Sequence, residues 1–190
     1  MGDKMATRVN SQYAITETRD WVERIVIGLN LCPFAPAPAL KGLIRYVTSD
    51  AETQEALLED LATELQRLVA APPEEIETTL LIHPRALQDF HDFNDFLEVA
   101  EELLRVLELE GEIQIASFHP HYQFADTESD DIGNATNRSP YPTLHLLREE
   151  SISRAVDSFG DTRRISTNNL ATLAKLGAEG LRALRRGELG

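Results

Sequence analysis

Along this chain, segments whose hydrophobic residues have helical spacing are followed by shorter segments typical of strands. Trp21, Val22 and Ile25 lie on one face of a helical turn, and similar faces recur twice more by residue 107. This spacing predicts amphipathic helices over residues 16–29, 50–70 and 90–107. Shorter runs rich in strand-forming residues predict three strands, “GLIRYVTS”, “IETTLLIHP” and “EIQIASFHP”.

The order of these elements predicts an α/β fold. One helix separates each pair of strands, which is typical of consecutive βαβ units and a small parallel or mixed sheet with helices packed on it. After the third strand, “TLHLLREESISRAVDSF” predicts a fourth helix, and “STNN” is expected to cap a last helix at a helical C-terminus. We expect one domain over residues 1–190, with residues 1–12 as a disordered tail.

Composition and charge narrow the classes of function. The formal net charge of −14 argues against nucleic-acid binding, which needs a concentrated positive surface. No apolar run approaches the roughly 20 residues that span a bilayer, and the polar N-terminus lacks the apolar core of a signal peptide. A cytoplasmic protein without a membrane partner is therefore expected. Arg and Lys are relatively more frequent after residue 131, where arginines could recognise an anion.

Histidines follow two of the predicted strands. His83 and His119 each precede a proline at a strand end, and His121 follows two residues later. Because the carboxyl ends of parallel strands share one sheet edge, we expect the three to lie close together. They could hold a divalent transition metal, although the sequence requires no cofactor. His119 could instead act as a general acid or base, or its ring could simply bond to the backbone.

The only cysteine, Cys32, follows the first predicted helix in “NLCPFA”. A lone cysteine forms no internal disulfide, and the simplest interpretation is a small buried or pocket-lining side chain. The functional alternative is a nucleophile activated by His119.

The segment “NATNRSPYPTLHLLREES” is dense in hydrogen-bonding groups. Its turn-forming residues could line an anion-sized nest, in which Arg138 would supply a planar bidentate donor. On the helix predicted to follow, His145 and Glu149 are four residues apart, with Arg148 beside them. The alternative is a rigid loop in which Arg138 pairs with an aspartate of the preceding acidic stretch, Asp130 or Asp131.

Four motifs, “NLCPFA”, “FHPHYQFA”, “TNRSPYP” and “LHLLREES”, resemble those of the uncharacterised family named domain of unknown function 1415. The resemblance covers about residues 16–152. It implies no activity, but it does imply a signature: Asn30, Cys32, Pro33, Phe34, His119, Pro120, Tyr122, Phe124, Asn137, Arg138, Ser139, Pro140, His145, Arg148 and Glu149.

The leading hypothesis is an enzyme or binding protein for a small anionic metabolite, a phosphate or a carboxylate. Its catalytic residues would be His119, Cys32 and Glu149, and its ligand-binding residues would be Asn137, Arg138, Ser139, Tyr122, His145 and Arg148. One alternative is a metal-dependent hydrolase that uses His83, His119 and His121. The other is a non-catalytic interaction module, built on the aromatic residues Tyr122, Phe124 and Tyr141. The oligomeric state does not follow from the sequence.

Overall fold

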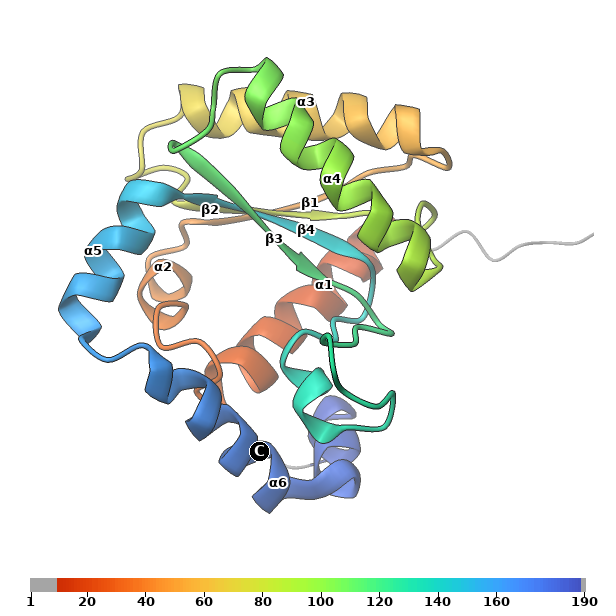
Figure 1. Ribbon diagram of the computed structural model, residues 1–190, viewed down its shortest axis with the longest axis vertical. Helices are drawn as coiled ribbons and strands as arrows, with labels where there is room; N and C mark the ends of the chain where they lie inside the picture. The colour runs from red at the N-terminus through yellow and green to blue at the C-terminus, as the bar shows by residue number, and fades with distance from the viewer. Residues whose placement is uncertain (1–9, 189–190) are drawn as a thin grey trace, which may run out of the picture.

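The computed structural model describes residues 10–188 and contains a four-stranded sheet in the order β1-β2-β4-β3. The strands are β1 (Ile44–Thr48), β2 (Thr78–Ile82), β3 (Ile113–Phe118) and β4 (Thr143–Arg148). β1 and β2 are parallel, whereas β4 is antiparallel to both of its neighbours. The predicted α/β fold with a small mixed sheet is confirmed (Figure 1).

The strand β4 corrects the predicted fourth helix. Leu144 and Leu146 are buried on one face of the sheet, whereas His145 and Leu147 point to the other, which is the alternation of a strand. β2 and β3 each have a free edge that this segment fills with backbone hydrogen bonds. That pairing outweighs local helical spacing, and the helix α5 starts only at Glu149 (Glu149–Phe159).

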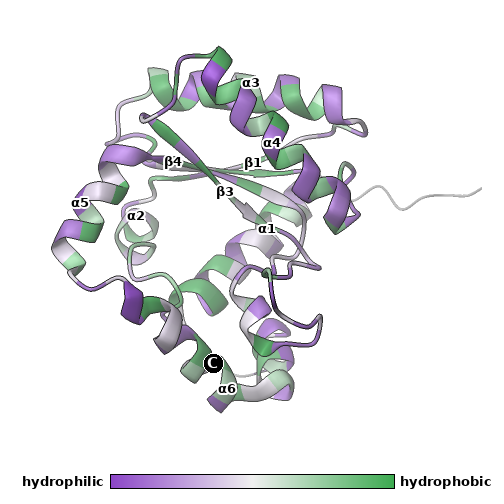
Figure 2. Ribbon diagram, viewed as in Figure 1, coloured by the Kyte–Doolittle hydropathy of each residue, from purple (hydrophilic) through white to green (hydrophobic). Residues whose placement is uncertain are grey.

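Helices α3 (Gln54–Ala70) and α4 (Phe90–Val106) cover one face of the sheet (Figure 1), called the α3/α4 face below. Both helices alternate hydrophobic and hydrophilic residues along their length (Figure 2). Their buried leucines and phenylalanines pack with Leu81, Leu144 and Leu146 in the larger of two hydrophobic clusters. This cluster is the main core of the protein.

The opposite face, called the α1/α6 face, carries Leu80 and Phe118. It is covered by α1 (Ser11–Trp21), by the π-helical turn η1 (Val22–Ile27) and by α6 (Arg163–Arg185). The first helix is thus confirmed, with a start five residues earlier than predicted. Of the tail predicted over residues 1–12, residues 1–9 lie outside the described residues, and Ser11 begins α1.

Two helices on this side contain no buried residue. They are α2 (Pro36–Leu40), in the segment whose prolines exclude a longer helix, and α5. The short 3-10 helix η2 (Ile132–Thr136) packs closely against α6: a Cβ on Gly133 would lie 2.7 Å from Leu170 Cδ2. Among residues 10–188, no helix is long and apolar enough to cross a membrane.

Candidate functional site

A cavity of about 470 Å³ opens on the α1/α6 side of the molecule. Its walls come from four distant parts of the chain: the turn after η1, the end of β3 with the following loop, η2, and the first half of α6. We call it the Cys32 cavity. The lining side chains used below are those of Cys32, Phe118, Phe124, Asn137, Asn169 and Leu170.

The turn that carries Cys32 is held by backbone reversal and by α6. Asn30 has φ of 53°, a left-handed conformation that asparagine tolerates better than most residues. The N–H of Leu31 then donates to Val26 O at 2.8 Å, and Asn169 Nδ2 donates to Leu31 O at 2.8 Å. These contacts explain the signature residue Asn30 and place Cys32 at the cavity wall.

The chemistry of Cys32 follows from its burial. Burial raises the pKa of the Cys32 thiol, and the backbone N–H groups of Phe34 and Ala35 only partly oppose this effect. No cationic group contributes to the shift, so the thiol is protonated at neutral pH. His119 packs beside Phe93 of α4 and contributes nothing to the pKa shift of Cys32, so the geometry does not favour the alternative in which His119 activates the thiol.

Asn137 reaches the cavity because the loop before it is pinned to β3. Asn137 O accepts from the N–H of His119 at 3.1 Å, and Asn137 Nδ2 donates to Ser117 O at 3.2 Å. The buried Asn134 shapes the rest of the loop: its Oδ1 accepts from the N–H of Phe124 and from Thr127 Oγ1. The density of amides in this segment is therefore largely structural.

Arg138 and Ser139 are also bound to the backbone. Arg138 Nε donates to Tyr122 O at 3.0 Å, and Nη2 donates to Ser129 O at 2.7 Å. The rigid loop proposed as the alternative for Arg138 is thus present, but it is built on carbonyls rather than on Asp130 or Asp131. Ser139 is buried and donates to Tyr141 O.

Of the three histidines at the strand ends, His83 and His119 lie in the same buried region, whereas His121 does not. His83 and His119 are buried beside Phe93, with ring centroids 5.7 and 5.1 Å from its ring, whereas His121 is exposed. His119 Nδ1 accepts from the N–H of His121, and Nε2 donates to Leu87 O. Burial lowers the pKa of His119, and lowers that of His83 to about 4.

This geometry does not favour the predicted metal site. Both ring nitrogens of His119 already have backbone partners, so coordination there would break a hydrogen bond. Within residues 10–188, no three His, Cys, Asp or Glu side chains are grouped so that they could hold a metal ion. The structure instead matches the alternative in which the histidine rings bond to the backbone: His83 bonds to Ala86 O, and His119 bonds to Leu87 O.

No residue of the fourth motif lines the Cys32 cavity, although the His145 ring lies 5.7 Å from that of the lining residue Phe118. His145, Arg148 and Glu149 do not share a helix, because His145 and Arg148 belong to β4. Arg148 donates from Nη2 to Leu68 O and Ala71 O at 2.6 and 2.7 Å, and thereby satisfies carbonyls at the end of α3.

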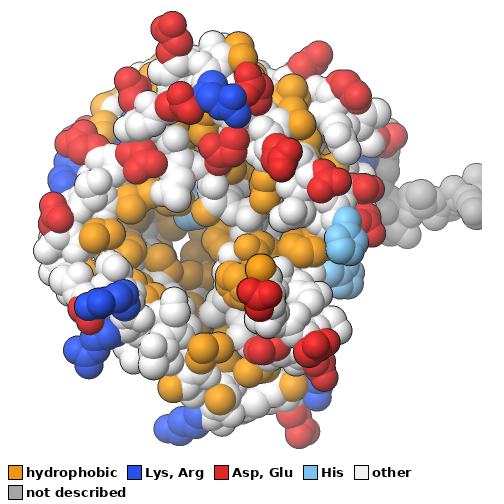
Figure 3. Space-filling model, in the orientation of Figure 1, with side chains coloured by type: hydrophobic (Ala, Val, Ile, Leu, Met, Phe, Trp, Pro, Cys, Tyr) orange, Lys and Arg blue, Asp and Glu red, His pale blue; other side chains and the backbone are white. Residues whose placement is uncertain are grey.

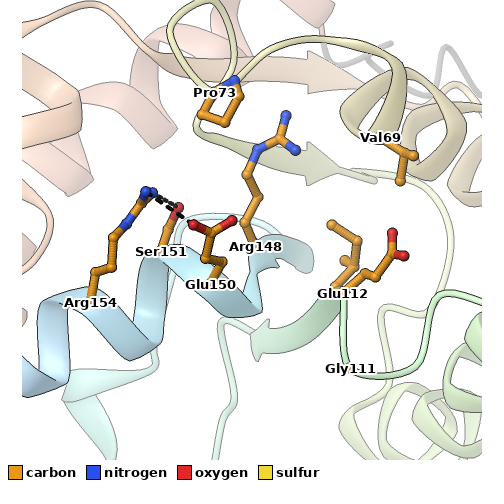
Figure 4. Close-up of a pocket in the computed structure, with 9 residues that line it drawn as sticks. Val69, Pro73, Gly111, Glu112, Arg148, Glu150, Ser151 and Arg154 are labelled. Carbon is orange, nitrogen blue, oxygen red and sulfur yellow. Dashed lines mark hydrogen bonds and ion pairs between the residues drawn. The ribbon is translucent and has the colours of Figure 1, made fainter.

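Arg148 borders a second cavity, of about 380 Å³, at the start of α5 (Figure 4). Arg154, its other arginine, turns back onto Glu150 and Ser151 of the same helix, at 3.3 and 3.2 Å. Both cationic groups are therefore engaged, and Glu112 and Glu150 add negative charge to the lining. An anion finds little free positive charge here.

Sequence reasoning found some lining residues and missed others. Cys32 and Asn137 were predicted site residues, and Phe124 belonged to the signature. Ser166 and Asn169 were missed, since “STNN” was interpreted only as a helix cap; α6 in fact begins at Arg163. The run of polar residues “STNN” within an amphipathic helix could have indicated that this part of α6 lines a site.

The family comparison agrees with the motifs. A family model described as “Protein of unknown function (DUF1415)” matches residues 13–183. Neither a search of curated proteins nor a search of solved structures found a match.

Proposed function

This chain belongs to the DUF1415 family, whose description assigns no reaction, and we propose from the geometry that it binds a small uncharged molecule in the Cys32 cavity. The main support for the proposal is that residues from different signature motifs line the same cavity. Cys32, Phe124 and Asn137 come from three of the signature motifs and line one cavity, although Cys32 precedes the other two by about a hundred residues of chain. A volume of about 470 Å³ lies within the range of small-molecule sites.

The lining favours an uncharged ligand over the phosphate or carboxylate predicted from the arginines. Its described side chains offer a thiol, two carboxamides, hydroxyls and one carboxylate, Asp131, among apolar walls, but no Lys, Arg or His. A desolvated anion needs a paired cation or several donors, and Arg138 and Arg148 are engaged elsewhere. An apolar molecule with amide-compatible groups suits this lining better.

The interaction module is supported less well. Tyr122 packs its ring against Phe90 at 5.3 Å, and the hydroxyl of Tyr141 donates to Glu17 of α1. Two of the three aromatic residues invoked for an interface are thus engaged within the fold. Phe124, which is 38% exposed, lines the cavity.

The proposal is tested with N-phenyl-1-naphthylamine, an uncharged dye whose fluorescence rises in apolar surroundings. We expect saturable binding to the wild type and a loss of about tenfold or more in affinity for Leu170→Trp, which fills the cavity. Val106→Trp is the matched control, because Val106 is an exposed residue of α4 outside the cavity. Equal binding by the wild type and Leu170→Trp would refute the proposed site.

The single thiol gives an independent measurement. Because Cys32 is the only cysteine, uncharged 4,4′-dithiodipyridine reacts with the protein only at this cavity. We expect saturating dye to slow that reaction several-fold in the wild type and in Val106→Trp. A reaction rate that the dye leaves unchanged would place the dye elsewhere.

A further inference from the structure

His145 lies in the middle of β4 on the α1/α6 face, opposite Leu80 of β2 and Ala116 of β3. Its side chain is half-buried, and its ring lies 5.7 Å from that of Phe118, which lines the Cys32 cavity. Phe118 thus lines the Cys32 cavity and also packs against His145.

The hydrogen bonds of Thr78 fix the tautomer of His145. The single hydroxyl hydrogen of Thr78 goes to Leu146 O, 2.6 Å away, so Oγ1 can only accept from His145 Nε2 at 2.8 Å. Nε2 therefore carries the ring hydrogen, and Nδ1 is left with a lone pair. Burial lowers the pKa of His145 to about 4, which keeps the ring neutral at physiological pH.

The lone pair of Nδ1 is free to accept a hydrogen bond. No side chain or backbone group within residues 10–188 bonds to it. The fully enclosed polar side-chain atoms without a partner in that range are Thr18 Oγ1, Trp21 Nε1, Thr79 Oγ1 and His83 Nε2. Nδ1 of His145 is not one of them, so this acceptor is not fully enclosed.

The surroundings of this acceptor are apolar. Figure 3 shows a hollow on this side of the molecule, with hydrophobic side chains around it. Ile152, Val156 and Phe159 form an apolar face on α5, yet none of them is buried, and Phe159 contacts Phe34 of the Cys32 turn at 5.6 Å. Leu147 of β4 is likewise only half-buried. Leu80, Ala116 and Phe118 lie beside His145 on the same sheet face, so this acceptor has apolar neighbours.

We propose that His145 Nδ1 accepts a hydrogen bond from a hydroxyl or N–H group of the ligand, which selects apolar alcohols, phenols or amides over ethers and esters. This inference rests on the proposed function in one respect, since the ligand is taken to occupy the Cys32 cavity and to extend past Phe118. It adds the class of ligand, which the cavity lining alone does not define.

Two uncharged probes of similar shape test the selection: 1-naphthol, which has a donor, and 1-methoxynaphthalene, which has none. His145→Gln keeps an N–H group near the position of Nε2 but removes the acceptor at Nδ1, whereas His145→Asn keeps an acceptor at the position of Nδ1. We expect His145→Gln to lower the preference for 1-naphthol about tenfold, the value of one good hydrogen bond, and His145→Asn to retain most of it.

The outcomes separate this inference from the proposed function. An unchanged preference in His145→Gln, or no preference in the wild type, overturns the acceptor role even where Leu170→Trp abolishes binding. If neither probe binds, chemical modification decides the role of His145, and binding of N-phenyl-1-naphthylamine still decides the proposed function.

Diethyl pyrocarbonate acylates accessible neutral imidazoles and is read out by peptide mass spectrometry. The exposed His91 is the positive control, and the enclosed His83 and His119 are negative controls. We expect His145 to be modified in the folded protein. A His145 as unreactive as His83 overturns the proposal.

Discussion

At the scale of single residues, two arginines of this protein stabilise the backbone. A guanidinium offers five N–H groups in a planar fork, so one side chain can satisfy several carbonyls that secondary structure leaves without a partner. Arg138 does this for the loop after β3, and Arg148 does it for the end of α3. Residues suited to anion recognition can thus be used entirely within the fold.

Arg148→Met should lower the free energy of unfolding by about 2 kcal/mol, because it leaves carbonyls at the end of α3 without a donor. Urea unfolding measures the change. Arg154→Met is the control: its ion pair with Glu150 is exposed, and its loss should cost less than about 0.5 kcal/mol. An Arg148→Met protein as stable as Arg154→Met would mean that the guanidinium is free to serve a ligand.

The buried histidines predict a dependence of stability on pH. The pKa values of His83 and His145 fall from 6.5 to about 4 on folding, so the unfolded chain takes up protons first as the pH drops. Their contribution is complete above pH 6.5 and is lost as the pH falls toward 4. Between pH 7 and 5 we expect a loss of roughly 2 kcal/mol per histidine.

Urea unfolding at pH 7, 6 and 5 measures this loss. His145→Gln removes one of the two groups and should show a clearly smaller loss than the wild type over the same interval. Parallel curves for the two proteins would show that His145 titrates normally in the folded state.

At the scale of elements, α6 depends on one kink. Gly177 has φ of 69° and ψ of 169°, a conformation that is essentially restricted to glycine, in the middle of the helix. The two halves of α6 therefore run in different directions, and each buries its own leucine, Leu173 before the kink and Leu181 after it. The kink lets one helix cover two parts of the α1/α6 face.

Gly177→Ala should lower the free energy of unfolding by about 1–3 kcal/mol through backbone strain alone, since no atom lies within 4 Å of the added Cβ. Gly180→Ala is the matched control. Its Cβ meets only the flexible side chain of Leu176, and better helix propensity offsets that contact. Thermal unfolding of both variants decides the matter, and equal melting temperatures would contradict the role of the kink.

At the scale of the whole molecule, negative charge dominates the surface. Asp and Glu number 32 against 18 Lys and Arg, and acidic side chains are spread over α3 and α4 in Figure 3. Such a surface disfavours anionic partners at long range and opposes the compact state through repulsion.

Added NaCl should therefore stabilise the protein by on the order of 1 kcal/mol between 0.02 and 0.5 M, through screening. Urea midpoints at each concentration measure the effect. Glu101→Lys, at an exposed residue of α4 that makes no ion pair within residues 10–188, should reduce the salt response. Destabilisation by salt would show that attractive pairs outweigh the repulsion.

Local patterns predicted much of this molecule. Helical spacing located α1, α3 and α4, and apolar runs located β1, β2 and β3. Each of these elements buries one face against a neighbour, so its apolar residues recur at a regular spacing along the chain. The motifs likewise identified the family and contain three lining residues, Cys32, Phe124 and Asn137.

The sequence by itself determined the α/β class, the family and the position of most elements, since each depends on residues that are close in the chain. Only the tertiary structure decided that Thr143–Arg148 is a strand, that Arg138 and Arg148 bind carbonyls, and that Ser166 and Asn169 join Cys32 at one cavity. Strand pairing, hydrogen-bond partners and cavity walls all join distant segments. Their energies depend on which segments meet, and no local period encodes that information.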